Sequence, residues 1–386
     1  MRELALHRTL YYASLALSHV FAWILLFDAL RMAGSVPAAL ALVSILYVLA
    51  HTGALFLTPL AGMALRNGVR RTLSLAVLCY ALALFVLAVA FSGGFGSAMT
   101  NAWLGSLGFV AFYALHRALY FAPFEVEASL FGARTRMLRE IVLATVPALA
   151  AFIVVLPSGH LWVLSIGALL ALLSLLPASR LPERYERFEW TYGESFAALM
   201  HRPHRRLVFG SFFDGIQGAG LLFFWPLALF FIVSGSYLAL GFVFSLTLLL
   251  TILARYLLRP YTASTLVWSP DTRATVMLSS WLMRFSAFSP ISAAVADTVY
   301  YAGSPHRVYA LDPLTLEQAA DRGGYIDELT TLKEMAYAAG RVCIGLVAAG
   351  VALTESIYAF FGVTFAFVVF ASLISIYLVR SESQLK

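Results

Sequence analysis

Long apolar runs alternate with short polar segments along the whole chain. The runs cover about residues 10–30, 38–65, 72–91, 101–124, 141–156 and 161–176, and then 207–233, 237–258, 274–288, 290–311, 335–353 and 356–379. A helix of roughly 20 apolar residues is long enough to cross about 30 Å of hydrocarbon. Because lipid offers no partners to backbone polar groups, spanning segments must be helices or a closed barrel, and these runs are too long for barrel strands. The pattern predicts an all-α membrane protein with about twelve transmembrane helices.

The clearest hydrophilic segment lies near the middle of the chain, at about residues 180–206. Within it, residues 192–201 could form a short amphipathic helix on the membrane surface. A short pattern also recurs about half a chain length apart: Pro-Phe-Glu-Val-Glu at 123–127 resembles Pro-Leu-Thr-Leu-Glu at 313–317, and each lies where the fourth run of its half ends. We therefore expect two pseudo-symmetric six-helix bundles, at 1–180 and 207–386, joined by a cytoplasmic central linker at 181–206.

Composition excludes a soluble domain. Hydrophobic residues make up 61% of the chain and charged residues only 12%, against about 25% charged in soluble proteins. The two cysteines, Cys79 and Cys343, both fall in apolar runs, so we expect no disulfide or metal framework. No nucleotide-binding P-loop, HExxH or GxSxG pattern is present, and the polar segments are too short for a catalytic domain. We expect neither an enzyme nor a bound cofactor, with protons as the only candidate coupling ion.

The net charge of +6 reflects orientation in a membrane rather than nucleic-acid binding. Arg and Lys gather in alternate loops, whereas the loops near residues 34, 94, 158, 235, 289 and 354 hold almost none. The positive-inside rule then places both termini in the cytoplasm. We expect a monomer in the cell membrane, of the bacterial inner-membrane kind, whose partners are membrane lipids and a small-molecule substrate.

The loop between the second and third runs resembles a motif of the major facilitator superfamily. That family has Gly, three residues, Asp-Arg, one residue and Gly-Arg-Arg; this chain keeps Gly62, Arg70 and Arg71. Arg66 stands where the motif has its acid, and Val69 where it has its second Gly. The family's exporters carry Gly-Pro-x-x-Gly-Gly in the fifth span, and residues 146–151 keep only its Pro.

This resemblance implies a secondary transporter in which two halves rock around a site near mid-membrane. It favours export of a small amphipathic solute, with proton coupling as one option. An importer of a small anion that uses Arg117, Arg284 and Arg341 is an alternative. A non-transporting receptor or lipid-moving protein with the same fold is another.

Charged residues at the expected cytoplasmic ends suggest a gate. Glu125 or Glu127 would pair with Arg70 or Arg71 when that side is closed. The equivalent pair in the second half would join Glu317 to Arg255 or Arg259. Alternatively, these charges only fix orientation and solvate loops.

Ionisable residues within the apolar runs are costly and therefore candidates for function. In the first half, Asp28 is either a proton site or the partner of Arg31 one helical turn on. His51 could titrate near neutral pH and carry a proton, or be a neutral histidine bonded to a neighbouring helix. His116 and Arg117 lie in the fourth run. The resemblance implies an arginine linked to proton coupling in this span, and Arg117 is in a plausible position for it. Arg117 could also hold an anionic substrate, modulate a carboxylate or snorkel to the cytoplasmic face.

In the second half, Asp214 and Gln217 lie among glycines in the seventh run, where they could form a site or simply be solvated. Asp297 is the deepest carboxylate and our candidate for proton coupling, with Arg284 and Arg341 as its potential partners.

Aromatic residues make up 14% of the chain. Most would contact lipid or form interfacial belts. Those beside polar positions could instead line a cavity for an amphipathic solute: Tyr11, Tyr12, Trp225, Tyr300 and Tyr301.

Overall fold

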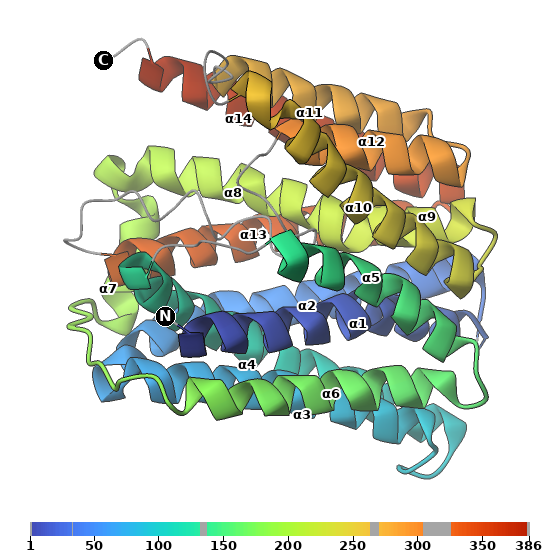
Figure 1. Cartoon of the computed structure of the whole chain (residues 1–386), viewed down its shortest axis with the longest axis horizontal. Coiled ribbons are helices and arrows are strands. Elements are labelled where there is room, and N and C mark those ends of the chain that lie inside the picture. The colour runs from blue at the N-terminus through green and yellow to red at the C-terminus, as the bar shows by residue number, and fades with distance from the viewer. Residues whose placement is uncertain (1, 33, 132–136, 263–269, 304–325, 384–386) are drawn as a thin grey trace.

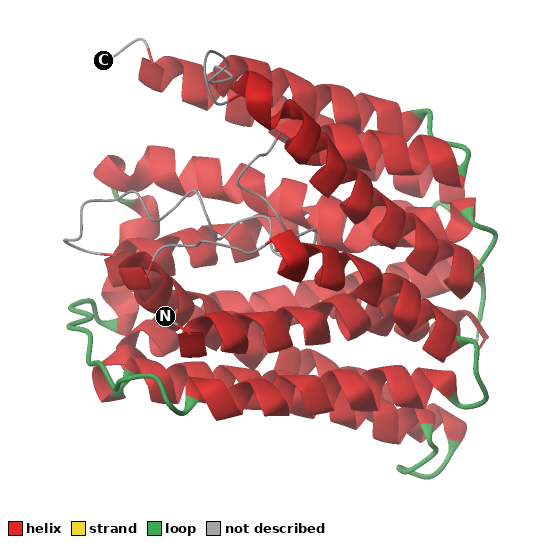
Figure 2. Cartoon of the chain, viewed as in Figure 1, coloured by secondary structure: helices red, strands yellow, loops and turns green. Residues whose placement is uncertain are grey.

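The computed structural model describes residues 2–32, 34–131, 137–262, 270–303 and 326–383, which form a bundle of roughly aligned helices (Figure 1). Figure 2 shows no strand among these residues. Nine of the described helices are long and apolar enough to cross a membrane, and Glu140–Val154 is a shorter apolar stretch. The chain is therefore a multi-pass, all-α membrane protein, as predicted.

The first group of long helices comprises α1 (Arg2–Met32), α2 (Val36–Ala64), α3 (Val69–Phe91), α4 (Ala98–Phe131), α5 (Met137–Val154) and α6 (Gly159–Ala178). A 3₁₀ turn, η1 (Leu65–Asn67), joins α2 to α3. Ser35 caps α2 by accepting a hydrogen bond from the Ala38 N–H, and Pro37 occupies the first turn. Gly68, between η1 and α3, has a φ of 125°, which requires glycine.

The extended segment 182–191 leads from the first group to the short helix α7 (Tyr192–Met200) and the turn η2 (Arg202–His204). Thr191 and Glu194 form a reciprocal capping box at the start of α7. These hydrogen bonds from Thr191 lower the pKa of Glu194. The short helix predicted at 192–201 is thus confirmed.

The second group begins with a continuous helical stretch, α8 (Arg205–Ala219), the π-helical turn η3 (Gly220–Phe224) and α9 (Trp225–Ile232). It continues with α10 (Tyr237–Thr262), α11 (Pro270–Phe285), α12 (Pro290–Gly303), α13 (Ile326–Ala352) and α14 (Ile357–Ser383). The eleventh run was expected to begin at 335, but α13 begins at Ile326, so its charged first turns belong to the helix. The predicted end of the tenth run, at 311, lies outside the described residues.

Several helix pairings of the first group recur in the second. In the first, α1 packs against α5 and α6, and α3 against α4 and α6. In the second, α8 packs against α13 and α14, and α11 against α12 and α14. The pair α2–α4 likewise matches α10–α12. Between the groups, α2 runs along α13 and α5 along α10.

Small residues allow these close approaches. A side chain at Gly215 or Gly340 would collide with the backbone of the facing helix, which brings α8 and α13 together. Gly241 on α10 similarly faces the Pro147 backbone on α5, so the two groups also touch closely. Figure 1 shows that α1 begins and α14 ends at the same end of the bundle.

Candidate functional site

Arg284 and Asp297 form an ion pair inside the second group. The Arg284 guanidinium donates to one Asp297 oxygen through Nη2 at 2.7 Å and through Nε at 3.1 Å. It also donates from Nη1 to the Ser280 hydroxyl at 3.2 Å. The two charged side chains are 0% and 3% exposed, so the pair is taken fully out of solvent. One of the two partners predicted for Asp297 is thus confirmed.

Aromatic rings surround the guanidinium of this pair. The Arg284 Cζ lies 4.3 Å from the Trp281 ring centre, 5.0 Å from Tyr300 and 5.2 Å from Trp225. Ring faces attract a cation, and more strongly when both are desolvated. With the carboxylate and the hydroxyl, they leave this arginine well compensated.

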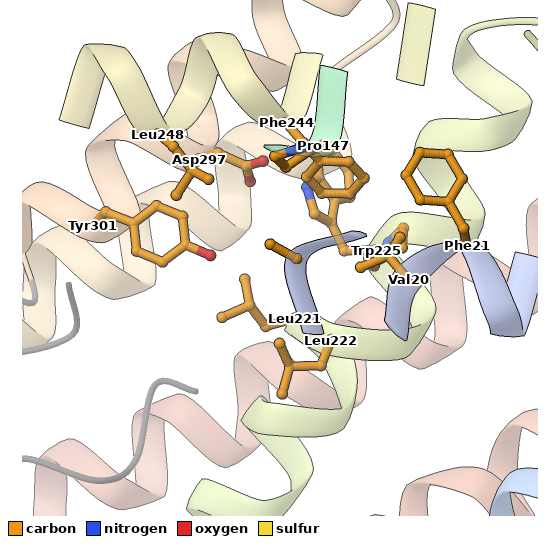
Figure 3. Close-up of a pocket in the computed structure, with 12 residues that line it drawn as sticks. Val20, Phe21, Pro147, Leu221, Leu222, Trp225, Phe244, Leu248, Asp297 and Tyr301 are labelled. Carbon is orange, nitrogen blue, oxygen red and sulfur yellow. The ribbon is translucent and has the colours of Figure 1, made fainter. Parts of the chain in front are cut away.

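A narrow pocket opens beside the pair, and Figure 3 shows Asp297 and Tyr301 on one wall with Trp225 on another. Helices of both groups line it: α1 supplies Phe21 and α5 supplies Pro147. The remaining lining residues are Ala16, Val20, Leu221, Leu222, Pro226, Phe244 and Leu248. Of the predicted cavity aromatics, Trp225 and Tyr301 line this pocket, and its walls are apolar apart from the Asp297 carboxyl, the Tyr301 hydroxyl and the Trp225 indole nitrogen.

A second charged centre lies between the groups, where α13 packs against α2 and α4. Arg117 of α4 contacts Glu334 of α13 at 3.5 Å, with side chains 12% and 9% exposed. The Arg117 Cζ also lies 4.0 Å from the centre of the Phe121 ring. Glu334 directly precedes the apolar run expected at 335–353, yet it is buried among the spanning helices, because α13 already begins at Ile326.

Arg341 lies close enough to this pair for the charges of Arg117 and Glu334 to act on it. It is 3% exposed, and within the described part of the chain it forms neither a hydrogen bond nor an ion pair. Its predicted pairing with Asp297 is not formed, since Asp297 is bonded to Arg284. Among the described residues, this centre therefore brings together two guanidinium groups and one carboxylate.

Aromatic and imidazole rings pack around the same space. Tyr47 stacks on Phe223 with ring centres 4.2 Å apart, and His51 meets Tyr47 edge-on at 4.3 Å. The Trp23 ring of α1 lies edge-on to the Tyr47 ring, with ring centres 5.6 Å apart. His19 stacks on Tyr113 at 5.5 Å. Of these residues, only His51 was predicted from the sequence as a candidate. The others, Trp23, Tyr47, Tyr113 and His19, are indistinguishable there from ordinary members of apolar runs.

Other predicted site residues lie elsewhere. His116 bonds to the Tyr11 hydroxyl at 2.8 Å and to the Ala76 carbonyl at 2.9 Å, inside the first group. Tyr11 and Tyr12 are buried there too, at 1% and 2% exposure. In the second group, Gln217 donates to Asp214 at 3.4 Å. None of these five lines the pocket in Figure 3.

The groups also meet at the end of the bundle where α1 finishes. Asp28 contacts Arg31 at 2.6 Å, which confirms the predicted local pair. The Tyr237 hydroxyl of α10 donates to the other Asp28 oxygen at 3.0 Å. This contact links α1 to α10.

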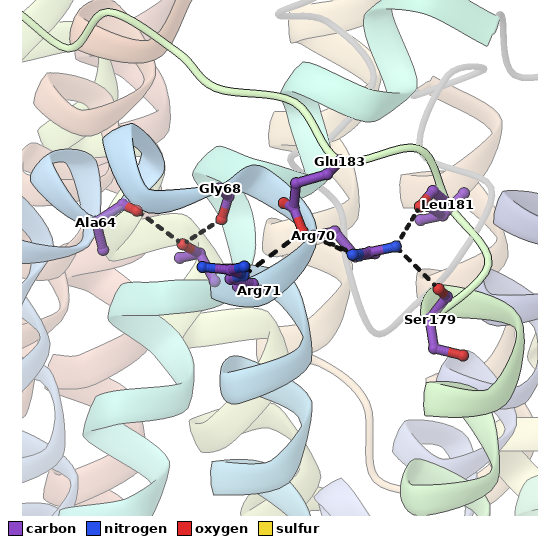
Figure 4. Close-up of polar contacts among 8 residues, drawn as sticks. Ala64, Gly68, Arg70, Arg71, Ser179, Leu181 and Glu183 are labelled. Atoms are coloured by element: carbon purple, nitrogen blue, oxygen red, sulfur yellow. Dashed lines mark hydrogen bonds and ion pairs between the residues drawn. The ribbon is translucent and has the colours of Figure 1, made fainter.

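At the opposite end, the linker rather than α4 supplies the carboxylate for the two motif arginines, as Figure 4 shows. Glu183 contacts Arg70 at 3.0 Å and Arg71 at 3.8 Å. Glu127 instead lies 3.7 Å from Arg184, and both Glu127 and Glu125 are buried. The expected pairing of these two glutamates with Arg70 or Arg71 is therefore not the arrangement here, because α4 continues to Phe131 and turns them inward.

Main-chain hydrogen bonds fasten the same linker to the first group. The Val69 N–H donates to the Arg184 carbonyl at 2.8 Å, and the Glu186 N–H to the Leu65 carbonyl at 3.3 Å. Further along, the Glu189 N–H donates to the Glu328 carboxylate at the start of α13, at 2.8 Å. Burial, together with the Asp327 carboxylate, raises the pKa of Glu186.

In the second half of the predicted gate, the side chains of Arg255 and Arg259, and the whole of Glu317, lie outside the described residues.

No protein-family model matches this chain, and no curated protein matches it in sequence. Solved structures do match. The xylose transporter XylE from E. coli, in a partially occluded inward-open conformation, is 14% identical with a TM-score of 0.63, and the match covers 98% of this chain and 97% of that one.

The human organic anion transporter MFSD10 is 17% identical with a TM-score of 0.61, and the nucleoside transporter NupG 13% identical with a TM-score of 0.56. Each of these matches covers 98% of both chains. The chain therefore has the fold of the major facilitator superfamily.

Proposed function

We propose that the protein is a secondary transporter of a small organic solute that carries one negative charge on an apolar or aromatic body. The observation that carries this proposal is Arg341, a buried cation between the two helix groups with no hydrogen bond or ion pair in the described part of the chain. An unpaired charge in the membrane interior is costly unless a partner arrives. A carboxylate solute would supply that partner and occupy the aromatic shell.

Movement would follow from the repeated packing. We infer that residues 1–180 and 207–386 are two repeats, since the helix pairs of one group recur in the other. Transporters built in this way bind solute where the repeats meet and rock them alternately. The Asp28–Tyr237 contact and the linker contacts then lie at opposite ends of the passage.

We place both termini and the linker on the cytoplasmic side. Arg and Lys gather in the loops that the sequence assigns to the cytoplasm, and α1 begins at the end of the bundle where α14 ends (Figure 1).

Two alternative solute classes follow from the two charged centres. The Arg117–Glu334–Arg341 centre favours an anion, and the organic anion transporter among the structural relatives agrees with it.

The apolar pocket beside Asp297 favours instead the proton-coupled export of an uncharged or cationic amphipathic compound. In that case Asp297 would release Arg284 when protonated, and transport would follow a pH gradient.

Counterflow in proteoliposomes tests the proposal. An aromatic carboxylate, its neutral amide and the matching amine would be compared in the natural protein and in Arg341→Gln and Arg341→Lys variants. We expect exchange of the carboxylate alone, its loss by at least about tenfold in Arg341→Gln, and partial recovery in Arg341→Lys. Equal exchange of the amide, or an unchanged Arg341→Gln variant, would refute an anion site at Arg341.

A further inference from the structure

A separate open groove lies on the outside of the first group, where α3 begins and α6 ends. It is lined by Arg70, Arg71, Ser74, Leu75, Leu78, Leu175 and Ser179. Figure 4 shows Arg70, Arg71 and Ser179 around the linker carboxylate of Glu183. The groove does not share a residue with the pocket beside Asp297 or with the centre around Arg341.

The two adjacent arginines of this groove have different tasks. Arg70 is committed to the linker: it contacts Glu183 through Nε and Nη2, both at 3.0 Å, and donates from Nη1 to the Ser179 and Leu181 carbonyls at 3.2 and 3.1 Å. Arg71 reaches Glu183 only at 3.8 Å, and its side chain is 70% exposed. Arg71 is therefore the cation that can take up an external anion.

The charges of the groove support the same conclusion. Glu183 is one carboxylate shared by two guanidinium groups, so one positive charge remains uncompensated there. The hydroxyl of Ser74, one turn along α3 from Arg70, has no hydrogen-bond partner within the part of the chain that the structure describes. A guanidinium beside a hydroxyl donor suits the oxygens of a phosphate.

The walls of the groove decide which kind of phosphate. Leu75 and Leu78 are 50% and 40% exposed on α3, and Leu175 of α6, on the other wall, is half-buried. Both helices are candidate membrane spans, so this surface faces hydrocarbon immediately beyond the arginines. A soluble phosphate would leave these leucines uncovered, whereas an acyl chain would follow them.

We propose that this groove binds an anionic membrane phospholipid, with the phosphodiester on Arg71 and Ser74 and an acyl chain along Leu75 and Leu78. Basic pockets at the cytoplasmic ends of membrane helices suit such headgroups. The proposal does not depend on what the protein transports. It also gives the motif arginines separate roles, since Arg70 secures the linker and Arg71 holds the lipid.

Lipid titration of the full-length protein tests this site. The purified protein in detergent would be titrated with dioctanoyl phosphatidylglycerol while bound lipid is counted by native mass spectrometry. Dioctanoyl phosphatidylcholine and glycerol 1-phosphate would be run in parallel. We expect phosphatidylglycerol to bind most tightly, Arg71→Gln to weaken it about fivefold, and Ser74→Ala to weaken it less.

Arg206→Gln is the matched control, because Arg206 is also exposed, at the start of α8. It should leave this affinity unchanged. Equal binding of phosphatidylcholine would contradict a headgroup held by charge. Glycerol 1-phosphate binding as tightly as the lipid would show a site for soluble phosphate. Arg71→Gln with natural affinity, or Arg206→Gln with the same loss as Arg71→Gln, would also overturn the assignment.

Discussion

The two charged centres of this protein differ in how completely they are compensated. Arg284 donates two hydrogen bonds to Asp297, at 2.7 and 3.1 Å, and a third to the Ser280 hydroxyl. Three aromatic rings also lie against its guanidinium. Between the helix groups, Arg117 and Glu334 are 3.5 Å apart and Arg341 brings an additional positive charge. The first centre lies on α11 and α12, within one group, and the second joins α4 to α13 across the two.

This difference separates a structural ion pair from the proposed binding site. A buried charge with every partner in place stabilises one arrangement of its helices and has little reason to take up a solute. A buried charge that lacks a partner remains available for a ligand, and in the proposed transport cycle its location between the two helix groups would couple occupancy to conformation. We therefore assign Arg284 to the stability of the second group and Arg341 to solute binding.

The largest effect should come from breaking the compensated pair. Asp297→Asn leaves Arg284 buried without its carboxylate, and we expect a loss of about 3–5 kcal/mol in the free energy of unfolding. Replacing both residues, as Arg284→Met with Asp297→Leu, should recover most of that loss. Unfolding in a denaturing detergent would measure both. If Asp297→Asn is as stable as the natural protein but loses only pH-driven transport, Asp297 is a proton carrier instead.

An intermediate effect should follow from removing the negative charge at the centre between the helix groups. Glu334→Gln removes the carboxylate that competes with an anionic solute for Arg117 and Arg341. We expect the apparent affinity for the carboxylate solute to rise about tenfold, with a smaller loss of stability than in Asp297→Asn. Equilibrium binding of a labelled solute would show it. A variant that binds the anion more weakly would mean that Glu334 itself contacts the solute.

The smallest effect is expected at the linker, where the pair is partly exposed. Glu183→Gln removes the contacts to Arg70 and Arg71, whose side chains are 34% and 70% exposed. Such pairs contribute about 0–1 kcal/mol, so unfolding should barely change. Hydrogen exchange should nonetheless quicken at the Glu186 amide, which bonds to the Leu65 carbonyl. Unaltered exchange there would show that main-chain bonds alone hold the linker.

The helical fold could be predicted because lipid imposes a length and a polarity on each spanning segment. The Asp28–Arg31 pair was also predictable, since one helical turn brings those two side chains together. The pairing of Asp297 with Arg284 was predictable as one of two possibilities, because a deep carboxylate needs a cation and the apolar runs contain few of them. The predicted domain limits, the number of spans and the side of the termini remain predictions.

The central site could not be found in the same way. Asp327, Glu328 and Glu334 resemble a solvated loop in the sequence, yet α13 begins at Ile326 and buries them against other helices and the linker. The position of Glu183 opposite Arg70 depends on how a segment more than a hundred residues later crosses the α2–α3 loop. Such partners are set by tertiary packing, and local periodicity carries no information about them.

The attachment of the linker at both ends limits how far the two helix groups can part on that side. Residues 184 and 186 are tied to the α2–α3 loop, and Glu189 is tied to α13. Beyond them the capping box keeps α7 wound, so little slack remains in the tether before α8 begins. A helical residue spans about 1.5 Å and an extended one about 3.3–3.6 Å. Wide separation of the groups at this end would thus first require release of the Glu189–Glu328 contact, and only then could unwinding of α7 lengthen the connection to α8.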